Sequence, residues 1–552
     1  MGKDAKSGES WEDRIAELRA QQRVVRTPNV KDPGYIRQKE AGKLWVRERV
    51  DALLDKGSFN EVGSVTGKPV YDEKTGELVS FIPSNLITGW GRVDGRKVFI
   101  TADDFSVRGG HADGGIAHKA PHGEILARKF RVPLIRLLDG SSGGGSVTTY
   151  LSSGSTYIPV LAGLGQSLDA LAVVPVASAL LGPVVGLAAA KAATSHFSVM
   201  VRGLSQFFAA GPPVVKEATF ENLTKEQLGG WEIHGQNGSV DNVVNTELEA
   251  FQEIRQFISF LPSNIFTLPP SSESNDPASR REEELLGIIP KRRGRTYDMR
   301  KVIRLIVDVV MEGAGTSSFF EIGSGWGRNA ITGLAQVAGK PVGVIASDCT
   351  VNGGAIDAFG SQKMARFINL CNHFHIPILN LVDQPGFAIG SLAERMATIR
   401  HGASAMAAIY NASVPIFTII IRRSFGVAGS IFGDPEDGRN FRVAWPSADW
   451  GSLPLEGGIE AAYKRQLNAT KSPEDRMKLM NELLDKFEPV RNPIRFANKF
   501  GVEEIVDPRD TRPLVCDWIS HAYECILPQL VTLSAASYGL DGKLSSGKGY
   551  KL

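Results

Sequence analysis

Short apolar runs of strand length stand out in the pattern of hydrophobic and polar positions along the chain. Four of them are residues 133–139, 172–181, 377–383 and 413–421, and each is followed within five residues by a glycine. Segments between the runs, such as Ser361–Cys371, space their apolar residues at helical intervals. Strands that alternate with helices, and that are apolar on both faces, predict an α/β fold.

The chain also repeats itself on the scale of a whole domain. Residues 87–110 and 331–354 are identical at eleven of 24 positions without a gap. The offset of 244, which becomes 240 after a small length change, also pairs Asp139 with Asp383 and Gly186 with Gly426. Solenoid repeats are much shorter, so the sequence predicts two copies of one domain.

A polar segment between the two copies predicts where they meet. Residues 268–295 are rich in Pro, Ser and charged residues, which is typical of a boundary between domains. We expect a first domain over residues 1–285 and a second over residues 286–552.

Composition and charge exclude several classes of protein. The 552 residues are 42% hydrophobic and 22% charged, with a net charge of +2, so nothing indicates a nucleic-acid or membrane surface partner. Residues 170–190 carry no charge and are long enough to cross a bilayer. However, they are broken by Pro and Gly, and the matching segment of the second copy contains Arg422 and Arg423, so we expect no membrane span.

The cysteines and the first residues of the chain bear on its compartment. The four cysteines form no C-x-x-C pair, which indicates a reduced, intracellular protein without a zinc ribbon. Residues 1–27 mix acidic with basic residues, unlike a transit or signal peptide. We expect a cytoplasmic protein, with the mitochondrial matrix as an alternative.

The glycine turns that follow the second apolar run of each copy are the candidate chemistry. A strand, a sharp turn and a helix N-terminus present backbone N–H groups that can bind phosphate or stabilise an oxyanion. A turn that only connects two elements explains the pattern equally well. The sequence has no P-loop, no H-E-x-x-H and no G-x-S-x-G motif, and its histidines do not predict a metal site.

Several motifs then resemble one family. Residues 37–62 are similar to the opening of acyl-CoA carboxylase carboxyltransferase subunits, the β subunits of propionyl-CoA and methylcrotonoyl-CoA carboxylases. Further matches follow in order over about residues 35 to 530, among them residues 382–387 (VDQPGF), 400–403 (RHGA) and 444–446 (AWP). The resemblance implies two tandem crotonase-like (ββα superhelix) domains, in agreement with the duplication.

The resemblance also implies the chemistry and its residues. In this family carboxybiotin releases CO2, the biotin ureide anion takes the α-proton of an acyl-CoA, and the resulting enolate attacks the CO2. Two backbone oxyanion holes replace a catalytic side chain. The hole of the first domain, for the thioester, maps to Gly186 and Leu187, and the hole of the second, for biotin, maps to Val427 and Ala428. Phe425, Gly426 and Ser430 map to the substrate pocket.

The chain departs from the family pattern inside these motifs. Leu187 and Val427 stand where the family has glycine, and Ser430 stands where propionyl-type enzymes carry Asp beside the acyl pocket. The N–H donors survive such changes, but the space near the substrate does not stay the same. The acyl group therefore cannot be assumed to be propionyl.

The resemblance further implies partners. The chain has no biotin attachment motif and no ATP-grasp region, so a separate α subunit would carry biotin, use ATP and bicarbonate, and bind a homohexamer of this chain that is a trimer of dimers. Two alternatives stay open: a subunit of a biotin-dependent acyl-CoA decarboxylase, or a non-catalytic scaffold whose altered glycines have lost oxyanion function.

Overall fold

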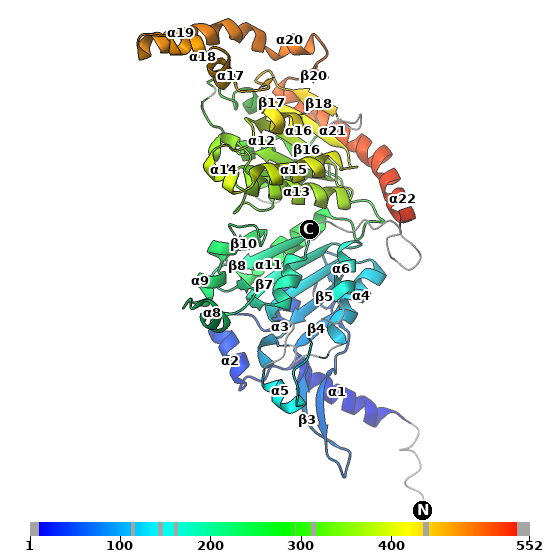
Figure 1. Cartoon of the computed structure of the whole chain (residues 1–552). Helices are drawn as coiled ribbons and strands as arrows, with labels where there is room; N and C mark the ends of the chain where they lie inside the picture. The colour runs from blue at the N-terminus through cyan, green and yellow to red at the C-terminus, as the bar shows by residue number, and fades with distance from the viewer. Residues whose placement is uncertain are drawn as a thin grey trace, which may run out of the picture. The chain divides into compact units, whose positions relative to one another are not determined.

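The computed structural model describes residues 10–111, 116, 118–141, 147–158, 164–292, 294–310, 316–433 and 441–537. Two compact units divide the chain. Unit 1 comprises residues 1–235 and 242–258, and unit 2 comprises residues 236–241 and 259–552 (Figure 1). Part of the N-terminal segment on which the compartment prediction rests, residues 1–9, lies outside the described residues.

Unit 1 is built on an eight-stranded sheet with a separate hairpin of β2 and β3. Its strands are β1 (Asn60–Glu61), β2 (Gly67–Tyr71), β3 (Leu78–Pro83), β4 (Leu86–Val93), β5 (Arg96–Asp103), β6 (Leu134–Gly140), β7 (Val176–Val185), β8 (Phe197–Val201), β9 (Gln206–Phe208) and β10 (Asn242–Val244). Its helices are α1 (Glu12–Arg26), α2 (Pro33–Glu40), α3 (Val46–Leu53), η1 (Arg108–Gly110), α4 (Lys119–Phe130), α5 (Thr148–Ser153), α6 (Leu164–Leu171), α7 (Leu187–Ala193), α8 (Pro212–Thr219), α9 (Lys225–Gly229), α10 (Trp231–His234) and α11 (Glu247–Phe260), whose last turn passes into unit 2.

Unit 2 repeats this plan. Its strands are β11 (Val309–Val310), β12 (Thr316–Ser317), β13 (Phe320–Glu321), β14 (Ala330–Val337), β15 (Lys340–Ser347), β16 (Ile378–Gln384), β17 (Ile416–Phe425), β18 (Phe441–Ala444), β19 (Asp449–Gly451) and β20 (Glu504–Ile505). Its helices are η3 (Glu283–Leu286), α12 (Met299–Ile306), η4 (Asn352–Gly354), α13 (Ala358–His373), α14 (Ser391–Arg395), α15 (Thr398–Tyr410), α16 (Gly426–Gly433), α17 (Leu455–Ala462), α18 (Lys464–Asn468), α19 (Pro473–Phe487), η5 (Glu488–Arg491), α20 (Pro493–Ala497), η6 (Pro508–Asp510), α21 (Thr511–His521), η7 (Ala522–Ile526) and α22 (Leu527–Ser537).

The two sheets have one topology, which confirms the predicted duplication. Unit 1 orders its strands β1-β4-β5-β6-β7-β8-β10, with β9 on β7, and unit 2 orders them β13-β14-β15-β16-β17-β18-β20, with β19 on β17. The first two pairings are antiparallel and the remainder are parallel in both units. Even the register shift recurs, between Leu138 and Gly140 and between Val382 and Gln384.

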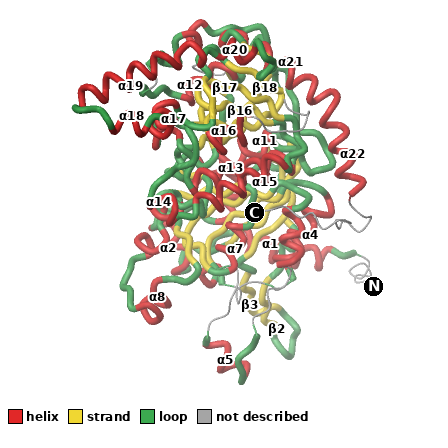
Figure 2. The backbone as a smooth tube through the Cα atoms, turned by 45° about the horizontal axis from the view of Figure 1, so that its top comes forward, coloured by secondary structure: helices red, strands yellow, loops and turns green. Residues whose placement is uncertain are grey.

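The apolar runs form the central strands, as the pattern predicts. Every residue of β16 is buried, because the sheet of unit 2 is covered by helices. The predicted helix over Ser361–Cys371 lies within α13, which packs beside α15 (Figure 2). The uncharged residues 170–190 form the end of α6, strand β7 and the start of α7, and no helix among the described residues is long and apolar enough to cross a membrane.

The change of unit falls at residue 259 rather than near residue 285. The polar stretch that suggested a linker is bonded into unit 2, since Asp276 is buried and pairs with Arg280 at 2.8 Å and with Arg512 at 3.3 Å. The backbone N–H of Ser272 also donates to Gly339 O. These residues have the composition of a linker, but the side chain of Asp276 has its ion-pair partners within unit 2.

Candidate functional site

Each unit ends its longest strand in the same turn. In unit 1, β7 leads through Gly186 into α7, and in unit 2, β17 leads through Gly426 into α16. Both glycines have a φ of 62°, a conformation that residues with a Cβ adopt at a cost. A Cβ on Gly186 would meet no atom within 4 Å, so backbone conformation and not space requires glycine there.

Backbone N–H groups at the turn of unit 1 are partly occupied. The N–H of Gly186 points to Phe208 O at 3.4 Å, and the N–H of Ala188 donates to Ser141 O at 3.0 Å. Leu187 is the first residue of α7, where an N–H has no partner within its helix. Of the predicted pair, Gly186 therefore forms the turn and Leu187 begins the helix.

In the turn of unit 2, Val427 has the position that Leu187 has in unit 1. The side chain of Val427 is exposed at 66%, whereas Ala428 is fully buried. Because Gly186 matches Gly426, Leu187 matches Val427, and the two predicted pairs share only this position. Leu187 and Val427 therefore occupy the same position, directly after the left-handed glycine, in the two units.

A buried ion cluster supports the turn in unit 2. The carboxylate of Asp383, at the end of β16, accepts hydrogen bonds from Arg423 Nε at 2.6 Å, Arg422 Nη2 at 2.8 Å and the Tyr297 hydroxyl at 3.0 Å. Burial opposes its charge, but the bonds and charges of Arg423 and Arg422 hold the pKa of this carboxyl below its usual range. Arg423 also donates to Gly353 O at 2.7 Å, which ties η4 to the end of β17.

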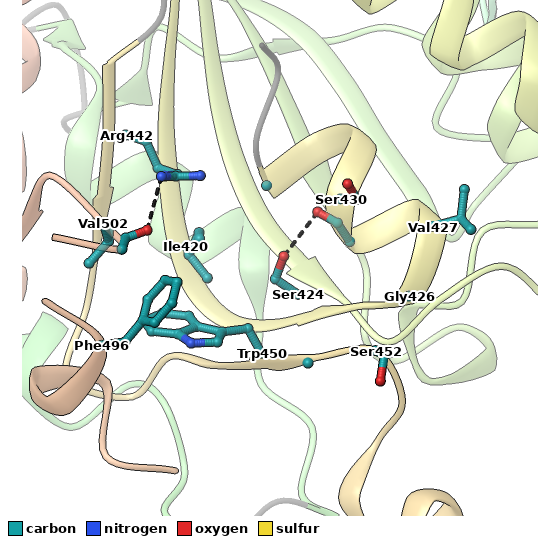
Figure 3. Close-up of a pocket in the computed structure, with 14 residues that line it drawn as sticks. Ile420, Ser424, Gly426, Val427, Ser430, Arg442, Trp450, Ser452, Phe496 and Val502 are labelled. Atoms are coloured by element: carbon teal, nitrogen blue, oxygen red, sulfur yellow. Dashed lines mark hydrogen bonds between the residues drawn. The ribbon is translucent and has the colours of Figure 1, made fainter. Parts of the chain in front are cut away.

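A pocket of about 560 Å³ opens beside this turn in unit 2 (Figure 3). Its walls include Ile420, Trp450, Phe496 and Val502, and it also contacts one side of α16. The full lining is Ile420, Ser424, Gly426, Val427, Gly429, Ser430, Gly433, Arg442, Trp450, Gly451, Ser452, Phe496, Gly501 and Val502. The only ionisable side chain in this described lining is Arg442.

A larger pocket, of about 1100 Å³, is also lined by the end of β17. Phe425 lines this pocket and not the smaller one. Five basic side chains contribute to it: Lys291, Arg422, Arg423, Arg491 and Arg495. Arg491 is paired with Asp449, and Arg422 and Arg423 are paired with Asp383.

The structure brings some of the sequence-predicted residues together. Gly426, Val427 and Ser430 line one pocket, whereas Phe425 is directed to the other. Gly186 and Leu187 belong to unit 1. Among the described residues no group of His, Cys, Asp and Glu side chains is arranged to hold a metal ion.

Sequence reasoning missed the far wall of the smaller pocket. Phe496 and Val502 follow Val427 by about seventy residues, and no motif marks them. The signal for Asp383 was present, because the repeat pairs it with Asp139, but its two arginine partners give no spacing that identifies a buried cluster.

Comparison with known proteins gives a family and close relatives. A family model described as a carboxyl transferase domain matches residues 37–524. A propionyl-CoA carboxylase carboxyltransferase subunit of Haloferax mediterranei is 34% identical over 513 residues, which cover 91% of this chain and 95% of that protein. The mitochondrial propionyl-CoA carboxylase beta chain of Homo sapiens is 32% identical and is covered over 85% of its length, against 87% of this chain.

Solved structures agree on the fold. A hexameric transcarboxylase 12S, crystallised with methylmalonyl-CoA and methylmalonic acid, matches with a TM-score of 0.78 and 27% identity over 100% of both chains. A single-chain, multi-domain long-chain acyl-CoA carboxylase matches 94% of this chain and 50% of its own with a TM-score of 0.76 and 23% identity, which shows the fold alone. The prediction of two crotonase-like domains is confirmed.

Proposed function

Because the chain belongs to the carboxyl transferase family, we propose that it transfers CO2 from carboxybiotin to an acyl-CoA and that one backbone donor in each unit, Leu187 N–H and Val427 N–H, assists the transfer. The chain is a carboxyltransferase subunit of the biotin-dependent acyl-CoA carboxylases. The assignment of acyl-CoA to unit 1 and biotin to unit 2 is part of the proposal.

One observation carries the proposed mechanism. The described lining of the 560 Å³ pocket contains no Asp, Glu, His or Lys, and a guanidinium such as that of Arg442 is a hydrogen-bond donor with no acceptor for a proton. In the proposed mechanism, which the family resemblance implies, the proton from the acyl α-carbon goes to the other substrate, carboxybiotin, which supplies CO2 and, once CO2 has left, a base; the absence of a basic group from this described lining agrees with it. The protein supplies position and hydrogen bonds.

The two donors act on oxygens that become negative. Leu187 N–H donates to the thioester oxygen as the α-proton leaves, and Val427 N–H donates to the ureido oxygen of biotin as CO2 leaves. Each donor lies at a helix N-terminus, whose dipole favours a negative charge. Asp383 pairs with both Arg422 and Arg423, so this cluster keeps one net positive charge.

Partners follow from the half-reaction. The biotin would arrive on a separate α subunit that uses ATP and bicarbonate, and the chain would form a hexameric core, as the transcarboxylase 12S does. The similarity to the propionyl-CoA carboxylase subunits and to the transcarboxylase 12S supports these two partners. The opposite direction, acyl-CoA decarboxylation, uses the same two donors.

The experiment is a half-reaction with the purified chain. Methylmalonyl-CoA, the ligand of the transcarboxylase 12S crystal, is offered with free biotin as acceptor, and propionyl-CoA formation is followed by chromatography. We expect product that depends on biotin concentration. A rate that is the same with and without biotin, or no product from methylmalonyl-CoA or from any 2-alkylmalonyl-CoA of longer chain, would contradict the proposed function.

A further inference from the structure

A pair of buried polar side chains lies at the same point of each sheet, on strands built largely of apolar residues. Arg136 on β6 stands opposite Ser178 on β7, and Asn380 on β16 stands opposite Thr418 on β17. The repeat matches Arg136 with Asn380 and Ser178 with Thr418. All four side chains are buried, so each needs a hydrogen-bond partner that offsets the loss of water.

In unit 2 the partner of this pair is the end of the helix that follows the turn. Asn380 Nδ2 donates to Phe432 O at 2.6 Å and to Thr418 Oγ1 at 3.2 Å. Phe432 is the next-to-last residue of α16, where a carbonyl has no partner within its helix. Val427 lies five residues earlier, about 7.5 Å away along the helix axis. One amide group thus holds one end of α16, and the other end carries the Val427 N–H.

In unit 1 the equivalent pair holds the end of α7. Arg136 Nη1 donates to Lys191 O at 2.9 Å and to Thr194 O at 3.1 Å. The Ser195 hydroxyl lies 2.6 Å from the Ser178 hydroxyl and donates to Lys191 O at 3.0 Å. Both members of the pair are therefore bonded, directly or through Ser195, to the C-terminal end of the helix that begins with the proposed donor of this unit.

Further partners within unit 1 fix the guanidinium of Arg136. Its Nε donates to Glu124 Oε1 at 3.2 Å, and its Nη2 donates to Ser167 Oγ at 3.0 Å. Arg136 and Glu124 are both buried, and a buried ion pair adds little stability compared with apolar residues of similar volume. The pair therefore indicates a role other than stability.

Small residues bring both helices close to their sheets, where α7 contacts β6 and β7, and α16 contacts β16 and β17. A Cβ on Gly429 would lie 2.4 Å from the backbone carbon of Ser424, and one on Gly433 would lie 2.4 Å from the Ser424 hydroxyl. The buried residues of α7 are alanines. Because the helices lie this close, polar side chains of the adjacent strands reach their last carbonyls.

We infer that Asn380 and Arg136 are positioning residues of the proposed function, on which this inference rests. Each side chain holds the C-terminal end of a short helix and so sets the direction of the donor N–H at its start. Backbone hydrogen bonds make such a helix rigid, so a shift at one end is carried to the other. A misplacement of about 1 Å can lower a rate roughly 100-fold. Both side chains are buried, so they act through the helix and not by contact with a substrate.

The test in unit 2 compares two variants that each remove a buried side-chain donor. Asn380→Leu removes the donor to Phe432 O, whereas Thr332→Val, on β14, removes the hydroxyl that donates to Ile322 O at 2.9 Å. With both variants folded by circular dichroism, Asn380→Leu should lower kcat of the biotin half-reaction roughly 10- to 100-fold. Its KM for biotin should stay within about 2-fold, because the donor acts as the charge develops. Thr332→Val should keep the parent kcat, and equal kcat values in the two variants would overturn the inference.

The matched test in unit 1 adds rescue by a conservative variant. Arg136→Met combined with Glu124→Gln removes both charges of the buried pair and should lower kcat in the same way. Arg136→Lys, which keeps the charge and a donor, should recover part of kcat. Thr88→Val, the counterpart of Thr332→Val, removes a buried bond to Ile100 O and should keep the parent rate. An Arg136→Lys variant as slow as the double variant would overturn the inference for unit 1.

Amide hydrogen exchange separates this inference from the proposed function. Peptides that cover α16 should exchange on the order of 10-fold faster in Asn380→Leu than in the parent chain, the equivalent of one lost hydrogen bond. Thr332→Val should leave their exchange unchanged. Unchanged exchange in Asn380→Leu, or faster exchange with an unchanged kcat, would overturn the inference and leave the function standing. A parent chain without biotin-dependent transfer would overturn the proposed function instead.

Discussion

Unit 1 and unit 2 place an aspartate at the same point of the same sheet and neutralise it differently. In unit 1, Asp139 pairs with Lys43 at 2.6 Å and with Arg49 at 2.8 Å, both from outside the sheet. In unit 2, Asp383 pairs with Arg422 and Arg423 of the adjacent strand β17. In unit 1 the positions equivalent to these arginines hold Gly182 and Pro183.

The difference shows which features the duplication has kept. Backbone features recur, including the strand order, the register shift and the left-handed glycine. Side chains around the turn have diverged, so that unit 2 has a basic strand end beside its donor. In the proposed function, one fold would thus provide the same N–H donor in two surroundings, one for each of two different substrates.

Removal of either aspartate should have the largest effect on stability. Asp139→Ala leaves Lys43 and Arg49 buried, and Asp383→Ala leaves Arg422 and Arg423 without their carboxylate. A buried charge that loses its partner costs about 3–5 kcal/mol. Urea unfolding of each variant measures this cost, and a loss under about 1 kcal/mol would show that the cluster is not a unit.

Arg423→Met tests the ion cluster of unit 2 alone, because unit 1 has no arginine at the equivalent position. It removes a charged donor from Asp383 and from Gly353 O, each worth about 1.5–3 kcal/mol, and frees η4 beside the turn of unit 2. We expect a lower kcat in the biotin half-reaction together with a lower urea midpoint. Arg423→Lys, which keeps the charge, should recover part of both, and no recovery would argue against an electrostatic role.

Equivalent lysines give a comparison that depends on pH. In unit 2, Lys363 Nζ donates to Gly323 O and Trp326 O, and burial lowers the pKa of Lys363 to about 7. At the matching position of unit 1, Lys119 Nζ donates to Gly63 O, and burial lowers the pKa of Lys119 to about 8. Between these values and the unfolded pKa of 10.5 the unfolded chain binds more protons, so the free energy of unfolding rises with pH.

Each lysine contributes at most about 1.4 kcal/mol per pH unit to this slope. The slope from Lys363 begins near pH 7, and the slope from Lys119 begins near pH 8. Lys363→Met and Lys119→Met, unfolded in urea at pH 7, 8 and 9, should each lack their own contribution. If the free energy of unfolding of both variants rose with pH as steeply as that of the wild type, the lowered pKa values of Lys363 and Lys119 would be contradicted.

Glycine at the two donors should have the smallest effect. Leu187→Gly and Val427→Gly keep both N–H groups and cost under about 1 kcal/mol of helix stability. We expect transfer rates within a few-fold of the parent chain. An inactive parent that gains activity in the double variant would support the scaffold alternative, in which the bulky side chains have abolished function.

Much of the fold was predictable from the sequence, and less of the site was. The apolar runs predicted the central strands of both sheets, because a strand pattern is local. The repeat predicted that the two sheets are alike. The boundary was misplaced, since the polar residues near Asp276 resemble a linker and yet bond into unit 2. The far wall of the pocket, Phe496 and Val502, depends on chain folding over about seventy residues, which no local pattern encodes.

The central claim is that one backbone N–H in each unit stabilises a developing negative charge. Proline lacks this N–H and is tolerated in the first turn of a helix, where Leu187 and Val427 lie. Leu187→Pro and Val427→Pro should each lower kcat of the biotin half-reaction by roughly 10²–10³, while Leu187→Ala and Val427→Ala stay near the parent rate and circular dichroism is unchanged in all four. Proline variants that turn over at the parent rate would contradict the account.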